Sequence, residues 1–203
     1  MISDPLVYLL LRTHNRQEEF QRCIESISEQ SVIPEIIIIS DDKNDNYINN
    51  VKLPHQVFRP LYKKPQWWIR HHNPFNDYFN QVLSLIPDGN FIYYLDDDDV
   101  LVDNNWIKTI LEENADLLIG RFQLGESHKG IIIGEQIARG KIGGSCIAVR
   151  SDIARQFKWP SRSAGDFFFI SQIINKYEPQ FISMIAGKVQ KDLQHSWGVR
   201  KNY

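Results

Sequence analysis

The sequence predicts an α/β protein in which a central, mostly parallel sheet is flanked by helices. Two observations carry this prediction. Short apolar runs alternate with helix-like patterns over the first half of the chain, which is the order that βαβ units produce. These runs are also continuous rather than alternating, as is typical of strands buried on both faces of a parallel sheet.

The first strand and the first helix are expected at residues 7–11 and 17–29. The strand is an unbroken apolar run that stops at the polar segment Arg12 to Arg16. The helix shows apolar spacings of three and four residues, which place one face toward the core. That face consists of Phe20, Ile24 and Ile27.

The second strand is expected at residues 35–39, directly after Pro34, and it ends in the polar segment 40–45. Residues 51–72 are harder to assign, and they are rich in proline, basic and aromatic residues. We therefore predict no element there.

Pro74 suits the first position of a helix, and a Pro-Asp-Gly turn at 87–89 follows that helix. The third strand is the apolar run 91–95, and four consecutive aspartates, Asp96 to Asp99, come directly after it. The second half of the chain is less regular, and we expect a smaller antiparallel part there. Its expected helices are 106–111, 151–157 and 166–177. Its expected strands are 116–122, 130–134, 146–149 and 181–185.

Length and composition indicate one globular domain, residues 1–203, with 42% apolar and 24% charged residues. A net charge of -2 gives no reason to expect a nucleic-acid partner. Two distant cysteines, Cys23 and Cys146, and the lack of a signal-peptide pattern predict a cytoplasmic protein. No apolar run approaches the ~20 residues of a membrane span, although a peripheral membrane contact is compatible with the sequence.

The four aspartates predict a binding site for a divalent cation. Adjacent carboxylates repel one another, and a cation such as Mg²⁺ or Mn²⁺ would remove that repulsion while also holding substrate phosphates. A solvated acidic turn is the alternative. The strand ends at Arg12, Asp41 and Asp96 belong to one sheet edge, where parallel α/β sheets bind ligands. No G-x-G-x-x-G or P-loop motif is present, so neither a dinucleotide nor a Walker-type site is supported.

The segments L-L-R-T-H-N-R, I-I-I-S-D-D-K-N-D and Y-Y-L-D-D-D-D-V-L resemble the inverting family 2 glycosyltransferases of the GT-A fold. The resemblance implies a Rossmann-like domain with a nucleotide-binding half, 1–100, and an acceptor and catalytic-base half, 101–203. It places Arg12 and His14 against the nucleotide base and ribose. It places Asp42 against the uracil edge. A surface ion pair for Arg12, a helix cap for His14 and a strand-ending turn for Asp42 are the alternatives.

The resemblance also implies roles for the acidic run and for the C-terminal half. Asp96 would hold the ribose and Asp98 the metal ion, with Asp97 as a rival for the ribose role. Asp166 would be the catalytic base, although an ordinary helix N-cap is its alternative. His195 would be a second metal ligand, or else a surface residue of the polar tail.

Two positions depart from the family pattern. Gly165 stands where the family has a glutamate before the catalytic aspartate, and Phe79-Asn80 replaces the usual Arg-Asn pair. Basic residues of the unassigned segment are candidates for supplying the missing positive charge. They are Lys63, Lys64 and Arg70.

The expected function is therefore a metal-dependent, inverting glycosyltransferase that moves a sugar from a nucleotide-diphosphate donor, with UDP favoured, to the hydroxyl of a glycan or other acceptor. A cation neutralises the leaving diphosphate and a base takes the acceptor proton. Two alternatives stay open. One is a sugar nucleotidyltransferase, and the other is a non-catalytic nucleotide-sugar-binding module of a larger protein.

Overall fold

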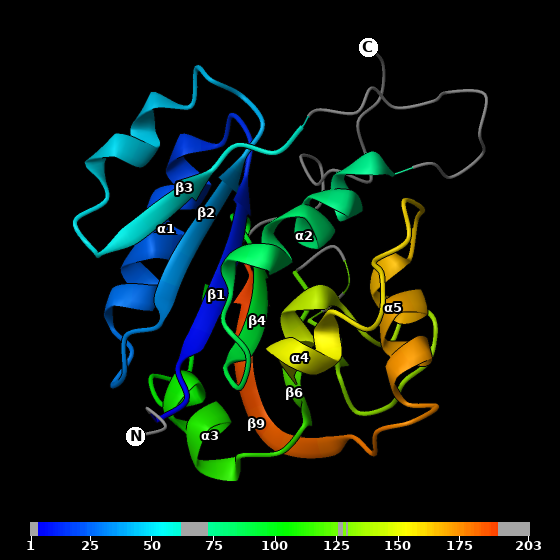
Figure 1. Ribbon diagram of the computed structural model, residues 1–203. Helices are drawn as coiled ribbons and strands as arrows, with labels where there is room; N and C mark the ends of the chain where they lie inside the picture. The colour runs from blue at the N-terminus through cyan, green and yellow to red at the C-terminus, as the bar shows by residue number, and fades with distance from the viewer. Residues whose placement is uncertain (1–3, 62–72, 126–127, 129, 191–203) are drawn as a thin grey trace.

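The computed structural model describes residues 4–61, 73–125, 128 and 130–190, and within them the chain folds as a mixed α/β domain (Figure 1). The strands are β1 (Val7–Thr13), β2 (Glu35–Ser40), β3 (His55–Phe58), β4 (Phe91–Asp96), β5 (Asp99–Leu101), β6 (Leu117–Gln123), β7 (Ile132–Ile133), β8 (Ile147–Arg150) and β9 (Gln180–Val189). The α-helices are α1 (Gln17–Ser28), α2 (Asp77–Val82), α3 (Trp106–Glu113), α4 (Ser151–Ala154) and α5 (Gly165–Ile173). Short 3₁₀ helices cover Asn46–Asn50, Pro74–Asn76, Leu83–Leu85 and Gly144–Cys146.

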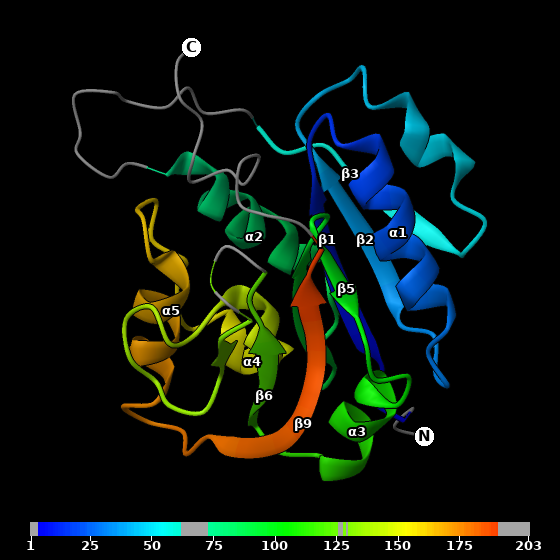
Figure 2. The ribbon, with the colours of Figure 1, turned by 180° about the vertical axis from the view of Figure 1, so that it is seen from behind.

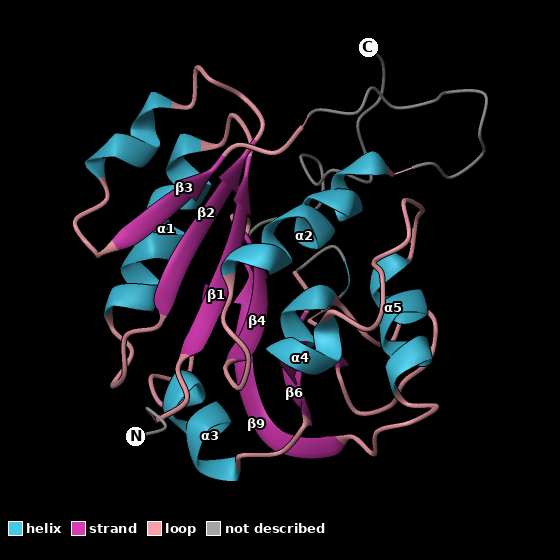
Figure 3. Ribbon diagram, in the orientation of Figure 1, coloured by secondary structure: helices cyan, strands magenta, loops and turns pink. Residues whose placement is uncertain are grey.

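The described strands form one sheet in the order β3-β2-β1-β4-β8-β6-β9-β5, with β7 paired to β6. The four strands β3, β2, β1 and β4 are parallel to one another. Strand β8 is antiparallel to both β4 and β6, whereas the long, curved β9 runs parallel to β6 (Figure 3). The predicted division into a parallel first half and a partly antiparallel second half is confirmed.

Helices cover both faces of the sheet. Helices α1 and α3 lie on the face that Figure 2 shows in front, whereas α2 and α4 lie on the face turned to the viewer in Figure 1. Helix α1 covers β1 and β2 through the apolar face that the sequence predicted, with Phe20 and Ile27 buried. Of the helices that the structure describes, none has the length and apolar character needed to cross a bilayer.

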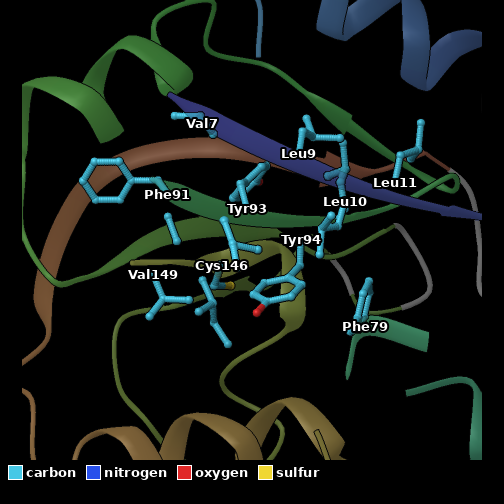
Figure 4. Close-up of a cluster of buried hydrophobic side chains, with 14 of the residues drawn as sticks. Val7, Leu9, Leu10, Leu11, Phe79, Phe91, Tyr93, Tyr94, Cys146 and Val149 are labelled. Carbon is cyan, nitrogen blue, oxygen red and sulfur yellow. The ribbon is translucent and has the colours of Figure 1, made fainter. Parts of the chain in front are cut away.

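The core explains why the apolar runs are continuous. Leu9, Leu10 and Leu11 of β1 are all fully buried, because helices cover both faces of the parallel strands. Figure 4 shows these side chains packed with Tyr93 and Tyr94 of β4. Each fully buried apolar side chain of this size contributes about 1.5–3 kcal/mol to folding. Cys23 and Cys146 belong to the same core as free thiols.

Three local differences from the sequence prediction affect the site. Strand β1 continues two residues further than expected, so Arg12 and Thr13 pair with neighbouring strands. Strand β3 was not predicted, because His55–Phe58 is a half-exposed edge strand without an apolar run. Strand β5 begins inside the acidic run, at Asp99, so the four aspartates join two strands rather than ending one.

Candidate functional site

A pocket of about 240 Å³ opens at the carboxyl edge of the parallel strands. It brings together residues from five separate parts of the chain, namely 12, 73–79, 94–98, 144–145 and 159–166, and the alignment of strand ends predicts such a meeting. The charged and polar residues among its lining are Arg12, Asn73, Asn76, Asp96, Asp98, Ser145 and Asp166. Aromatic side chains, among them Phe79 and Trp159, form much of the remaining wall.

Asp96 and Arg12 are paired across neighbouring strands. They are register partners in the parallel β1–β4 ladder, and Arg12 donates from Nε to Oδ1 at 2.8 Å and from Nη2 to Oδ2 at 2.9 Å. The guanidinium also lies over the ring of Phe79, 4.9 Å from its centroid. Two parallel, charge-assisted hydrogen bonds fix the Asp96 carboxylate at the pocket wall.

Asp97 lies behind the pocket wall and is fully buried. Its Oδ2 accepts hydrogen bonds from the Thr13 hydroxyl at 2.7 Å and the His14 backbone N–H at 3.3 Å. Its Oδ1 lies 2.8 Å from Nη2 of Arg16. Burial raises the pKa of Asp97 well above its usual value, and Arg16 opposes that rise.

Asp98 is the aspartate of the turn that reaches the pocket. Its side chain keeps 21% of its surface exposed, and Oδ2 lies 2.7 Å from Nη1 of Arg16. Burial raises the pKa of Asp98, with the neighbouring charge of Asp96 acting in the same direction and Arg16 against it. Asp99 is buried and does not line the pocket, and its carboxylate accepts a hydrogen bond from the hydroxyl of Ser145, which does.

Gln190 fixes the backbone of the acidic turn. Its side-chain amide donates to the carbonyl oxygens of Asp97 and Asp99 at 3.1 and 3.2 Å. Its backbone N–H donates to the Asp98 carbonyl at 2.8 Å. Gln190, which is distant in sequence, therefore holds the acidic turn through three hydrogen bonds.

Asp166 faces the same pocket from the first turn of α5. It follows Ala164, which has a φ of +56° and is one of three described non-glycine residues with positive φ. A left-handed backbone is costly for alanine, and such strain is typical of functional loops. Burial raises the pKa of Asp166, and the nearby charge of Asp96 adds to the rise. A raised pKa suits a group that must accept a proton near neutral pH.

His14 and Asp42, the other residues expected at the nucleotide, lie in the loops beyond β1 and β2. His14 Nδ1 is 2.7 Å from Oδ1 of Asp41, whose Oδ2 accepts the Tyr78 hydroxyl at 2.7 Å. Asp42 instead accepts the backbone N–H of Asn44 at 2.8 Å. Neither His14 nor Asp42 lines the pocket within the described part of the chain.

The residues at the pocket fit a divalent cation that arrives with phosphate ligands. Within the described ranges, no group of three or more acidic, histidine or cysteine side chains could hold a metal ion. Mg²⁺ and Mn²⁺ commonly bind one or two carboxylates and complete their shell with water and substrate phosphates. Asp98 beside Asp96 offers that kind of partial site. His195, Lys63, Lys64 and Arg70 lie outside the described residues.

Sequence reasoning did not assign roles to Arg16 and Asn76. Arg16 was visible only as the last residue of the polar segment after β1, and its two carboxylate partners are more than 80 positions away. Asn76 donates to the carbonyl oxygens of Pro160 and Arg162 at 3.0 and 2.9 Å, which fixes the loop before Asp166. No local signal marks either contact.

No protein-family model matches the chain, and no curated protein sequence matches it. Solved structures share its fold. A mannosyltransferase from Pyrobaculum calidifontis, in complex with GDP-Man and Mn²⁺, has a TM-score of 0.64 at 12% identity over 92% of this chain. This chain spans 57% of that mannosyltransferase.

Two further structures match over nearly their whole length. CMP:2-keto-3-deoxy-manno-octonic acid synthetase complexed with CTP has a TM-score of 0.54 at 10% identity, covering 91% of each chain. 4-Diphosphocytidyl-2C-methyl-D-erythritol synthase has a TM-score of 0.61 at 8% identity, covering 96% of each chain. At such identities the likeness establishes the Rossmann-like fold alone.

Proposed function

We propose that the protein is a metal-dependent, inverting glycosyltransferase that uses a nucleotide-diphosphate sugar, with a UDP-sugar favoured. The observation that carries the proposal is the pocket in which Asp96 and Asp98 meet Asp166. Two carboxylates at a sheet edge suit a cation and a nucleotide, and a third with a raised pKa suits proton transfer. The resemblance to family 2 glycosyltransferases assigns the same residues to these roles.

The donor half of the reaction falls mainly to residues 1–100, with His195 contributed from the C-terminal half. Asp98 would hold Mn²⁺ or Mg²⁺, and His195, which follows Gln190 by five positions, would be a second ligand. A bound cation would act as a Lewis acid on the diphosphate leaving group. Asp96 would bind the ribose, while Asp42 and His14 would contact the base.

Arg12 and Asp97 contribute to nucleotide binding through their neighbours in this proposal. Both Asp96 oxygens accept hydrogen bonds from Arg12, so Arg12 orients the carboxylate that meets the ribose. Asp97 is fully buried and ties the acidic turn to Thr13. Its burial makes Asp96 the better ribose ligand of the two.

The acceptor half of the reaction falls to residues 101–203. Asp166 would take the proton from the acceptor hydroxyl while that oxygen attacks the anomeric carbon of the donor sugar. The carbon–oxygen bond to the diphosphate breaks on the opposite side, so the configuration is inverted. The half-buried position of Asp166 keeps the carboxylate basic, because burial disfavours its charged form.

A sugar nucleotidyltransferase is the second candidate. The observation in its favour is length, because two synthases with this fold match over 91% and 96% of both chains. Nucleotidyltransferases resemble this chain less in the loop after β1. They typically carry a glycine-rich basic loop there, whereas Arg12 to Arg16 contains no glycine.

One incubation series separates these functions. The protein is mixed with Mn²⁺ and a panel of UDP-, GDP- and CMP-linked sugars, with and without hydroxyl acceptors, and the products are resolved by chromatography. Release of nucleoside diphosphate from a UDP- or GDP-linked sugar, with transfer of the sugar to the acceptor, supports the proposal. Pyrophosphate-dependent formation of a nucleoside triphosphate supports the nucleotidyltransferase. Binding without turnover of any donor supports a binding module.

A further inference from the structure

Arg16 spans two successive aspartates of the acidic turn with one guanidinium group. Nη2 lies 2.8 Å from Oδ1 of Asp97, and Nη1 lies 2.7 Å from Oδ2 of Asp98. The Arg16 side chain is only 10% exposed. A planar, permanently charged guanidinium can contact two carboxylates at once, which the ammonium of lysine does less well.

The backbone around Arg16 fixes where this charge lies. Asn15, with a φ of +48°, donates its N–H to Asp45 at 2.9 Å. The Arg16 N–H donates to the Tyr47 hydroxyl at 3.4 Å, and the Arg16 carbonyl accepts the N–H of Phe20 at 2.9 Å in the first turn of α1. The guanidinium is therefore built into the fold rather than placed by a flexible loop.

This arrangement changes how a cation can reach Asp98. The repulsion between adjacent aspartates, which the sequence alone assigns to a metal ion, is already offset by Arg16 and, at Asp96, by Arg12. A lone divalent cation at Asp98 would meet the positive charge of Arg16 and only part of one carboxylate. A cation bound to a diphosphate brings its own negative ligands, which offset that repulsion.

Resting on the proposed function, we infer that Arg16 is the resident counterion of Asp97 and Asp98, and that the protein takes up its divalent cation together with a nucleoside diphosphate rather than alone. Arg16 is a positioning residue in this scheme. It keeps the acidic turn folded in the absence of metal and makes metal uptake conditional on the diphosphate.

The test measures Mn²⁺ affinity by calorimetry and by the loss of the free Mn²⁺ spin-resonance signal, first with MnCl₂ alone and then with saturating UDP, GDP or CDP. Each mixture is compared with the same mixture without protein, because the diphosphates themselves bind Mn²⁺. For the wild-type protein we expect one of these diphosphates to tighten Mn²⁺ binding by about tenfold or more. By linkage, Mn²⁺ must tighten binding of that diphosphate by the same factor, which provides an internal check. Equal Mn²⁺ affinity with and without each diphosphate overturns the inference.

Three variants separate the charge of Arg16 from a general effect on folding. Arg16→Gln should bind MnCl₂ alone more tightly than the wild type, so that the diphosphate effect shrinks to about threefold or less. Arg16→Lys keeps the charge and should retain most of the wild-type effect. Arg121→Gln removes an arginine that pairs with Glu135 at 3.2 Å on β6, away from the pocket, and should behave as the wild type.

The outcomes distinguish this inference from the proposed function. An unchanged diphosphate effect in folded Arg16→Gln overturns the role of Arg16 alone. If Arg16→Gln does not fold, two other results still overturn the inference. One is loss of the diphosphate effect on Mn²⁺ binding in Arg16→Lys, and the other is absence of that effect in the wild type. Intact coupling of Mn²⁺ and diphosphate without sugar transfer by the wild type leaves the inference standing and counts against the glycosyltransferase. No Mn²⁺ uptake by the wild type under any condition overturns both.

Discussion

The carboxamide of Asn76 occupies the space that a side chain at Gly165 would need. A Cβ atom at position 165 would collide with Nδ2 of Asn76 and would lie 3.2 Å from the carbonyl oxygen of Pro160. Position 165 therefore has room for glycine but not for a residue with a side chain. Asn76 also fixes the loop before Asp166 through its hydrogen bonds to the carbonyl oxygens of Pro160 and Arg162.

Gly165→Ala should therefore destabilise the protein. Alanine is usually favoured over glycine inside a helix by about 0.5–1 kcal/mol, but overpacking here should outweigh this and cost about 1–3 kcal/mol. Urea unfolding of the two proteins measures the difference. A double-mutant cycle with Asn76→Gly is the control, because the collision should disappear when Asn76 is removed. If Gly165→Ala is as stable as the wild type, the loop moves to accept the added Cβ atom without cost, and the prediction is wrong.

Arg12→Lys should lower the free energy of unfolding by about 1–3 kcal/mol, because lysine keeps the charge but loses the paired hydrogen bonds to Asp96. The measurement is again denaturant unfolding. Arg121→Lys is the matched control, since its ion pair with Glu135 is exposed and should contribute less than about 1 kcal/mol. If both variants lose the same free energy of unfolding, the Arg12–Asp96 pair contributes no more to stability than the exposed Arg121–Glu135 pair.

Asp98→Asn should weaken Mn²⁺-dependent binding of UDP by about tenfold or more, the size typical of losses in metal-site support. The amide keeps the shape of the side chain but removes the charge that attracts the cation. Thermal shift with UDP, with and without MnCl₂, measures this effect. Asp152→Asn, an exposed aspartate in the first turn of α4, is the control. If UDP binding by Asp98→Asn depends on Mn²⁺ as strongly as it does in the wild type, Asp98 is not a metal ligand.

The pH dependence of transfer should reflect Asp166. The base must be ionised, and burial raises its pKa, so kcat/KM should rise with pH through a value above the ordinary aspartate pKa of about 3.9. The same shift favours the protonated folded state. The stabilisation from protonated Asp166 is fully present below the pKa that Asp166 has in the unfolded chain. It is lost as pH rises through the pKa that Asp166 has in the folded protein. A rate plateau that extends down to about pH 4 contradicts this role.

The parallel half of the fold was readable from sequence because its strands are buried on both faces. Such strands must be apolar throughout, and their polar ends must share one edge, which places Arg12, Asp96 and Asp98 together. Strand β3 was missed because an edge strand such as His55–Phe58 needs no apolar run. The start of β5 was hidden inside a run of identical charged residues.

The individual roles of the four aspartates could not be read from sequence. Successive side chains leave a strand end in different directions, so Asp97 is buried, Asp98 meets the pocket and Asp99 contacts Ser145. Which direction each takes depends on partners far along the chain, above all Arg16 and Gln190. The sequence predicted that negative charge gathers there, but not that arginines neutralise much of it.

The most direct test of the proposed function compares sugar transfer and donor binding in Asp166→Asn, with Asp152→Asn as the control. Each protein is incubated with Mn²⁺ and the donor and acceptor pair that the wild type uses, and transferred sugar is counted. The base role predicts that Asp166→Asn loses transfer by about 10²-fold or more while its donor affinity stays near wild type. Full transfer by Asp166→Asn contradicts it.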